Sequence, residues 1–191
     1  LDYTKGLLER FKALEFFFDT YPAYKENFTF LQIASPSRES VPKYKQFNAD
    51  MTKEVERINI KFKTKNWQPI VLLKEHHSHE ELAPLFKIAD VCMVTSLHDG
   101  MNLVAKEYIA ARDKEDGVLI LSQFAGAVRD LKDVLVVNPY SAEETSEAIN
   151  IALNMPLPEQ QRRMKKMRES IKNYNIYRWS AEFIKAVTSL S

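Results

Sequence analysis

One short segment, residues 99–107 with the sequence DGMNLVAKE, places two carboxylates beside a glycine turn and the start of a helical stretch. It follows the apolar run 91–94, which is typical of a buried strand. A strand that turns into a helix points backbone N–H groups and the positive end of the helix dipole at the carboxyl edge of a sheet, where α/β proteins hold phosphates and sugar hydroxyls. Asp99 lies in the turn, and Glu107 lies one helical turn beyond Leu103 on the same face. Because two acids suit hydroxyls better than phosphate alone, the segment predicts a site for a nucleotide sugar.

The elements that must position this segment alternate between helices and strands. Helical spacing and start signals predict helices over 5–20, 41–63, 78–89, 102–112, 142–153, 158–173 and 179–187. Short apolar runs predict strands at 28–34, 69–73, 91–94, 118–121 and 134–137. This alternation favours an α/β fold, a doubly wound, Rossmann-like parallel sheet with helices on both faces, in a single domain over residues 1–191.

Composition narrows the class of protein. With 191 residues and 45% hydrophobic residues, the chain is long enough for one full core. A net charge of +1 predicts no nucleic-acid or anionic-membrane partner, and no apolar run reaches the roughly 20 residues that span a bilayer. The single cysteine, Cys92, lies within an apolar run, so we expect a buried strand residue and not a nucleophile. One cysteine forms no internal disulfide, which favours a cytoplasmic location.

Several separate motifs resemble one known family. The segments LDYTKG, SPSRESVPKY, DGMNLVAKEYIAA, GVLILSQFAGA, VNPY and RWSAEFI are similar, in the same order, to those of the trehalose-6-phosphate synthase family of glycosyltransferases. The resemblance covers nearly the whole chain, but only the C-terminal, donor-binding half of a family member. It implies the C-terminal lobe of a GT-B type glycosyltransferase, with an N-terminal acceptor lobe before LDYTKG in the full enzyme. The implied activity is retaining transfer of glucose from UDP-glucose to glucose 6-phosphate, giving α,α-trehalose 6-phosphate without a metal or other cofactor.

The resemblance also assigns roles to individual residues, beside simpler interpretations. From the residues alone, Lys5 is a solvated lysine, Asp99 an N-cap, Glu107 a surface carboxylate, and Leu103 and Val104 are core residues. The resemblance instead implies that Lys5 neutralises the leaving diphosphate, Asp99 binds glucose hydroxyls and Glu107 binds the ribose. It makes Lys5 and Asp99 the catalytic residues. It assigns donor binding to Lys5, Ile33, His76, Leu82, Asp99, Gly100, Met101, Asn102, Leu103, Val104 and Glu107.

Two further segments complete the predicted site. Arg38, in the loop after the strand 28–34, matches the family arginine that binds the phosphate of glucose 6-phosphate. Residues 76–82 contain three histidines, but their spacing is not that of a zinc helix, so we expect no metal there. His98 stands where the family most often has an arginine. The family arginine that shares the role of Lys5 precedes LDY and lies outside this chain, so we expect the isolated chain to be inactive.

Other interpretations remain open on the sequence alone. A sister synthase would use another acceptor, as glucosylglycerol-phosphate synthases do, or another base such as ADP or GDP. A non-catalytic regulatory domain would keep the sugar-nucleotide pocket as a sensor. A doubly wound domain of unrelated function is the third alternative, because this architecture hosts many functions.

Overall fold

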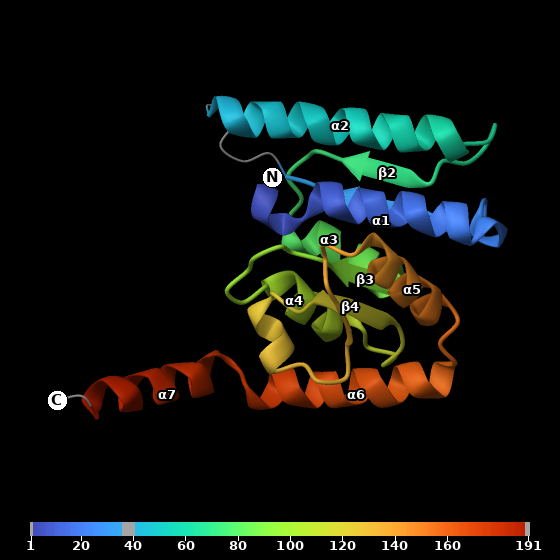
Figure 1. Ribbon diagram of the computed structural model, residues 1–191. Coiled ribbons are helices and arrows are strands. Elements are labelled where there is room, and N and C mark those ends of the chain that lie inside the picture. The colour runs from blue at the N-terminus through green and yellow to red at the C-terminus, as the bar shows by residue number, and fades with distance from the viewer. Residues whose placement is uncertain (1, 36–40, 190–191) are drawn as a thin grey trace.

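The computed structural model describes residues 2–35 and 41–189 as an α/β fold (Figure 1). Its strands are β1 (Phe30–Ile33), β2 (Ile70–Leu73), β3 (Val91–Val94), β4 (Val118–Ser122) and β5 (Leu135–Val137). Its α-helices are α1 (Leu7–Thr20), α2 (Pro42–Phe62), α3 (His79–Ile88), α4 (Leu103–Ala111), α5 (Ala142–Leu153), α6 (Leu157–Asn173) and α7 (Ile176–Thr188). A short 3₁₀ turn, η1 (Tyr3–Lys5), precedes α1, and two more, η2 (Pro22–Tyr24) and η3 (Gly126–Arg129), lie in loops.

The strands form two parallel groups. In one, β1 pairs with β2, with Ile33 opposite Leu73 at the carboxyl end. In the other, β4 lies between β3 and β5, with Val94 opposite Leu121. Every strand pair among the described residues is parallel, so the carboxyl ends of neighbouring strands within each group meet at a common edge.

The central strand β4 shows that helices cover both of its faces. All five of its residues are buried, and successive side chains enter different hydrophobic clusters. Val118 and Ile120 pack in the cluster that contains residues of α1, α2 and α5. Leu119 and Leu121 pack in the cluster that contains residues of α4 and α6. A parallel strand with helices packed on both of its faces is the arrangement found in α/β proteins. The predicted α/β class is therefore confirmed.

Helix contacts agree with this layering. On one side α1 packs against both α2 and α5, and on the other α4 packs against both α3 and α6. In Figure 1, α2 and α6 lie at opposite ends of the molecule, and α7 projects beyond α6 away from the rest of the chain. Trp179 and Phe183 of α7 are more than half exposed, with their rings stacked at 5.4 Å. The apolar face of this helix is therefore exposed.

Most predicted boundaries agree with the structure to within two residues, and two helix starts differ for local reasons. The first helix begins at Leu7 instead of Lys5, because Lys5 belongs to η1 and Gly6 adopts a left-handed conformation with φ 65°. The last begins at Ile176 instead of Trp179, because the side chain of Asn175 accepts hydrogen bonds from the next turn and acts as the N-cap.

Two expectations from composition also concern the fold. Among the residues that the structure describes, no helix is long and apolar enough to cross a membrane. Burial raises the pKa of the Cys92 thiol to about 12, so the thiol is protonated at neutral pH. Cys92 lies in β3 as expected but is partly and not fully buried, and its protonated thiol agrees with a structural cysteine and not with a nucleophile.

Candidate functional site

An ion pair joins the two residues predicted to be catalytic. Lys5 Nζ lies 2.7 Å from Asp99 Oδ2, although 94 residues separate them in the sequence. Lys5 comes from η1 before α1, and Asp99 comes from the loop after β3. The backbone brings them together, because Leu97 and His98 both donate N–H bonds to the carbonyl of Thr4, at 2.8 and 3.2 Å. A cation and a carboxylate therefore share one place at the carboxyl end of β3.

Gly6 allows these two loops to approach each other. A Cβ built on Gly6 would lie 2.2 Å from the carbonyl oxygen of Thr95, closer than any real Cβ contact. Its φ of 65° also belongs to the left-handed region that glycine adopts without strain. The glycine of the sequence TKG is therefore required for the position of Lys5 against the end of β3.

Asp99 is an ionised acceptor. Its Oδ2 accepts from Lys5 and from Asn102 Nδ2, the latter at 2.9 Å, and lies 3.4 Å from Ser96 Oγ. Burial acts to raise the pKa of this carboxyl, but the bonds from Lys5 and Asn102 outweigh burial and hold the pKa below its usual value. Its side chain retains 12% exposure, so the carboxylate faces solvent on one side. Such a group suits hydroxyl donors of a sugar.

The N-cap of α4 is Asn102 and not Asp99. Asn102 Oδ1 accepts from the backbone N–H of Ala105 at 3.0 Å, while its Nδ2 donates to Asp99. The simpler interpretation of Asp99 as an N-cap is therefore wrong. Asn102 has φ 80°, a conformation that costs an L-residue on the order of 1 kcal/mol or more. Its two side-chain bonds hold it there, and so the first turn of α4 is fixed to the carboxylate.

The first turn of α4 is open at its surface. Met101, Leu103 and Val104 are exposed, at 47%, 60% and 45%. The interpretation of Leu103 and Val104 as core residues is therefore wrong, because their side chains are not in the core. The first backbone N–H groups of a helix have no partner within it and carry the positive end of its dipole, which favours an anion. The predicted segment 100–104 is thus placed where a diphosphate could be bound by main-chain donors.

The loop 124–127 holds the segment 99–101 in place through backbone hydrogen bonds. Ala127 N donates to Met101 O at 2.8 Å, Gly126 N donates to Asp99 O at 2.9 Å, and Asp99 N donates to Phe124 O at 3.3 Å. A Cβ on Gly126 would lie 2.0 Å from the carbonyl oxygen of Gly100, whereas a Cβ on Gly100 itself would meet nothing within 4 Å. Within the protein the glycine is required at Gly126, and the open side of Gly100 leaves room for a ligand to approach the backbone.

Glu107 lies one turn further along α4 and faces the start of α3. Its Oε1 is 3.8 Å from Nδ1 of His79, in the segment 76–82 that contains the predicted donor-binding residues His76 and Leu82. Ser78 caps α3 in a capping box with Glu81, which fixes where that segment turns into the helix. Glu107 and His79 of this segment are therefore neighbours.

Ile33 is the last residue of β1 and lies near the segment 76–82. The backbone N–H of Ala34 donates to Leu73 O at 2.8 Å, and Ser35 Oγ donates to Glu75 O at 3.4 Å. The chain after Ile33 thus runs beside the chain that leads to His76. Arg38, the predicted acceptor residue, lies outside the described residues. Over residues 2–35 and 41–189 there is no group of three His, Cys, Asp or Glu side chains that could hold a metal ion.

The sequence did not lead us to expect a buried polar cluster of Arg10, Thr95 and Gln32 next to the site. Arg10 of α1 is 7% exposed, and its guanidinium donates to Thr95 Oγ1 at 2.8 Å and to Gln32 Oε1 at 2.7 Å. The sequence did contain a signal, because Arg10 lies three residues after Leu7 and four before Leu14, on the buried stripe of α1. A charged residue on such a stripe indicates a specific partner.

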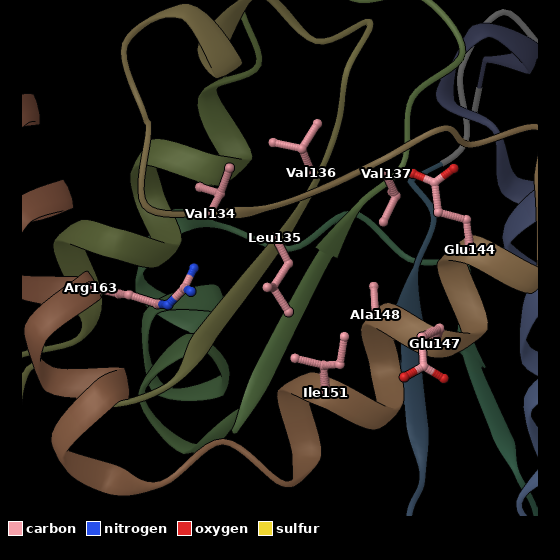
Figure 2. A pocket seen from close by; sticks show the side chains of 9 residues that line it. All are labelled: Val134, Leu135, Val136, Val137, Glu144, Glu147, Ala148, Ile151 and Arg163. Carbon is pink, nitrogen blue, oxygen red and sulfur yellow. The ribbon is translucent and has the colours of Figure 1, made fainter.

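A separate apolar hollow lies along β5, away from these residues (Figure 2). It has a volume of about 490 Å³ and lies between β5 and α5, with Arg163 at one end. Its lining residues are Val134, Leu135, Val136, Val137, Glu144, Glu147, Ala148, Ile151 and Arg163. None of the predicted site residues is among them, so this hollow is not the candidate site.

With this geometry in place, comparison with known proteins identifies the family. The sequence profile of glycosyltransferase family 20 matches residues 1–189. The chain belongs to glycosyltransferase family 20. Curated relatives of this family-20 chain include two proteins named trehalose-6-phosphate synthase. The protein of Sodalis glossinidius is 43% identical over 96% of this chain, and that of Klebsiella pneumoniae is 42% identical over all of it. The resemblance stated from the motifs is confirmed.

Solved structures agree with the family-20 fold. An E. coli protein bound with UDP-2-fluoro glucose matches 97% of this chain with a TM-score of 0.95 at 42% identity. A UDP-forming α,α-trehalose-phosphate synthase of Burkholderia xenovorans, in complex with glucose-6-phosphate, matches 98% with a TM-score of 0.95 at 41% identity. The predicted fold class, a Rossmann-like lobe of a GT-B glycosyltransferase, is confirmed. The chain spans 39% and 40% of the length of the two curated relatives, and 42% of each of these two solved chains.

Proposed function

We propose that this chain is the donor-binding part of a retaining glucosyltransferase that forms α,α-trehalose 6-phosphate from UDP-glucose and glucose 6-phosphate. The observation that carries the proposal is the contact of Lys5 with Asp99 beside the N-terminus of α4. A lysine, a carboxylate and the backbone amides of a helix N-terminus in one place match the diphosphate and the hydroxyls of a nucleotide sugar. The names of the relatives and of their bound ligands support the same substrates.

Each group of residues has a separate role in the proposed mechanism. Lys5 and the amides of residues 100–104 stabilise the negative charge that develops on the departing UDP. Asp99 exchanges its contact with Lys5 for hydroxyls of the transferred glucose, which fixes the sugar for attack. Glu107 binds the ribose diol, and Ile33, His76 and Leu82 border the base. No step needs a metal ion or another cofactor, because fixed protein charges supply the stabilisation.

The acceptor side belongs to a further part of the enzyme in this proposal. The curated relatives are about two and a half times as long as this chain, which supports an additional lobe. Arg38 binds the phosphate of glucose 6-phosphate from this side, and the additional lobe completes the acceptor site and supplies a second cation beside Lys5. We propose a cytoplasmic location, where the nucleotide sugar and the sugar phosphate are both made.

Thermal unfolding in the presence of UDP tests the donor site. A ligand that binds only the folded state at 100 times its Kd adds about 2.7 kcal/mol, which raises the Tm of a chain of this size by roughly 5–11 °C. Lys5→Met should remove most of this rise. Lys87→Met is the matched control, because Lys87 is similarly exposed and forms a 2.8 Å pair with Asp113 that lies outside the predicted site.

Three outcomes would contradict parts of the proposal. A Tm that stays constant up to millimolar UDP refutes the donor site, and an equal or larger rise with ADP or GDP refutes the choice of uracil. In a coupled assay of UDP release, the 191-residue chain alone should show no dependence on glucose 6-phosphate. Acceptor-dependent release above background would show that the additional lobe is not needed.

A further inference from the structure

Arg10 connects three separate parts of the candidate site. Its Nε donates to Thr95 Oγ1 at 2.8 Å, just beyond the end of β3. Its Nη1 donates to Gln32 Oε1 at 2.7 Å, in β1, and its Nη2 lies 3.2 Å from the carbonyl oxygen of Lys5. The two strands belong to different hydrogen-bonded groups, so a side chain from α1 bridges the two parts of the sheet.

The partners of Arg10 lead directly to predicted ligand contacts. Lys5 is the predicted phosphate ligand, and its own carbonyl is held. Gln32 also donates from Nε2 to the carbonyl of Ile33 at 2.7 Å, the predicted neighbour of the base. Thr95 precedes Ser96, whose hydroxyl lies 3.4 Å from Asp99. One guanidinium therefore bonds to the backbone of the residue assigned to phosphate and to a side chain that bonds to the residue assigned to the base. Its third partner, Thr95, leads through Ser96 to the residue assigned to the sugar.

Arg10 is an unusual choice for a purely structural position. Among the residues that the structure describes, no carboxylate lies within ion-pair distance of it, and all three of its acceptors are neutral. Burial lowers the pKa of its guanidinium to about 10, so the charge persists at neutral pH. A buried charge without a countercharge is unfavourable for folding, and a well-packed apolar residue often serves stability as well or better. The planar guanidinium instead provides donors in a fixed arrangement, which Lys cannot reproduce.

We propose that Arg10 is a positioning residue that sets the spacing between the phosphate-binding, base-binding and sugar-binding parts of the donor site. It acts through Lys5, Gln32 and Thr95 and does not touch the ligand. The inference rests on the proposed function for the identity of the ligand, whereas the geometry that it describes is a property of the chain itself.

The test compares Arg10→Lys, which keeps the charge but not the fixed arrangement, with Arg112→Lys. Arg112 is the matched control, because it is 5% exposed and donates to Phe86, Lys87 and Ala89 carbonyls and to Asp116. Both variants should lower the Tm. Arg10→Lys alone should weaken UDP binding, measured by calorimetry well below the Tm, by about tenfold or more, as expected when charged hydrogen bonds are lost.

Two further measurements separate positioning from general destabilisation. Uridine contacts only one part of the site, so Arg10→Lys should weaken uridine binding much less than UDP binding. In NMR hydrogen exchange, the amides of Leu97 and His98, which bond to Thr4 O, should exchange about tenfold faster or more, relative to the amides of α5. If Arg10→Lys does not fold, Thr95→Val takes its place. It removes one contact of Arg10 and should shift both readouts in the same direction.

The outcomes distinguish the two proposals. Loss of affinity for UDP and uridine by the same factor, or equal effects of Arg10→Lys and Arg112→Lys, would overturn the positioning role. Unchanged exchange at Leu97 and His98 in both Arg10→Lys and Thr95→Val would overturn it as well. If the unaltered chain fails to bind UDP, the proposed function is wrong, and the exchange rates still decide whether Arg10 holds the Lys5 turn.

Discussion

Replacing Gly126 with alanine tests how the segment that carries Asp99 is held. The added Cβ would lie 2.0 Å from Gly100 O and 2.7 Å from Gly100 C, where ordinary contact begins at 3.4 Å. Both atoms belong to backbone, which cannot rotate away as a flexible side chain would. The segment must therefore move by about 1 Å or more, which breaks the 2.9 Å bond from Gly126 N to Asp99 O and strains the 2.8 Å bond from Ala127 N to Met101 O.

The size of the effect follows from these contacts. Overpacking costs about 1–3 kcal/mol, and each lost hydrogen bond costs about 1 kcal/mol. We expect Gly126→Ala to lower the free energy of unfolding by about 2–4 kcal/mol, and the Tm by roughly 4–16 °C for a chain of this length. The movement also displaces Asp99 from Lys5, so UDP should stabilise the variant less than the original chain.

Gly100→Ala is the matched control for this experiment. A Cβ on Gly100 meets no atom within 4 Å, so its free energy of unfolding should stay within about 0.5 kcal/mol of the original. Its methyl group would face the proposed ligand, so UDP-glucose should bind less tightly. Equal stability of the two variants in urea denaturation would refute the packing argument. Unchanged ligand binding by Gly100→Ala would show that no ligand approaches the backbone there.

Three further predictions concern single groups. In the longer enzyme that we propose, Asp99→Ala should reduce turnover far more than UDP affinity, since UDP is assigned to Lys5, amides and Glu107. Calorimetry that shows UDP binding lost together with activity would contradict this assignment. Hydrogen bonds from Arg57 and Lys61 lower the pKa of Glu15 from 4.5 to about 2, so Glu15 stabilises the fold above pH 4.5 and this contribution is lost as the pH falls toward 2. The stability difference between the original chain and Glu15→Gln in urea should therefore shrink over that window, and a constant difference would contradict the pairing. The Cys92 thiol, with a pKa near 12, should resist iodoacetamide at pH 8 in the folded chain and react in urea, and equal rates would show that it is exposed.

The helices and strands were predictable because their signals are local. The continuous apolar run 118–121 indicates a strand buried on both faces, and β4 is such a strand. Ser78 followed by two acidic residues is a local start signal, and in the structure Ser78 and Glu81 form the capping box of α3. The pairing of the strands in two groups was not predictable, because it depends on contacts between residues far apart in the sequence.

The site was predictable only in part, for the same physical reason. Asp99 and Glu107 belong to one strand-to-helix segment, so the sequence alone places one carboxylate before α4 and the other within it. The pairing of Lys5 with Asp99 depends on contacts across 94 residues, and only the family resemblance suggested a shared role for them. The cap of α4 was assigned to the wrong residue because Asp99 and Asn102 are both good capping residues, and only the backbone conformation decides between them.

The exposed position of α7 affects how the chain unfolds. None of its 13 residues is buried, so neither hydrophobic cluster of the chain includes it. Helices of this length are marginal in water without packing, and their formation is coupled to the rest of a protein only through shared contacts. We therefore expect α7 to unfold locally at low free-energy cost, and its amide protons to exchange faster than those of β4 and α5. We therefore expect the cooperative unfolding transition in calorimetry to involve fewer residues than the chain contains, with α7 unfolding separately.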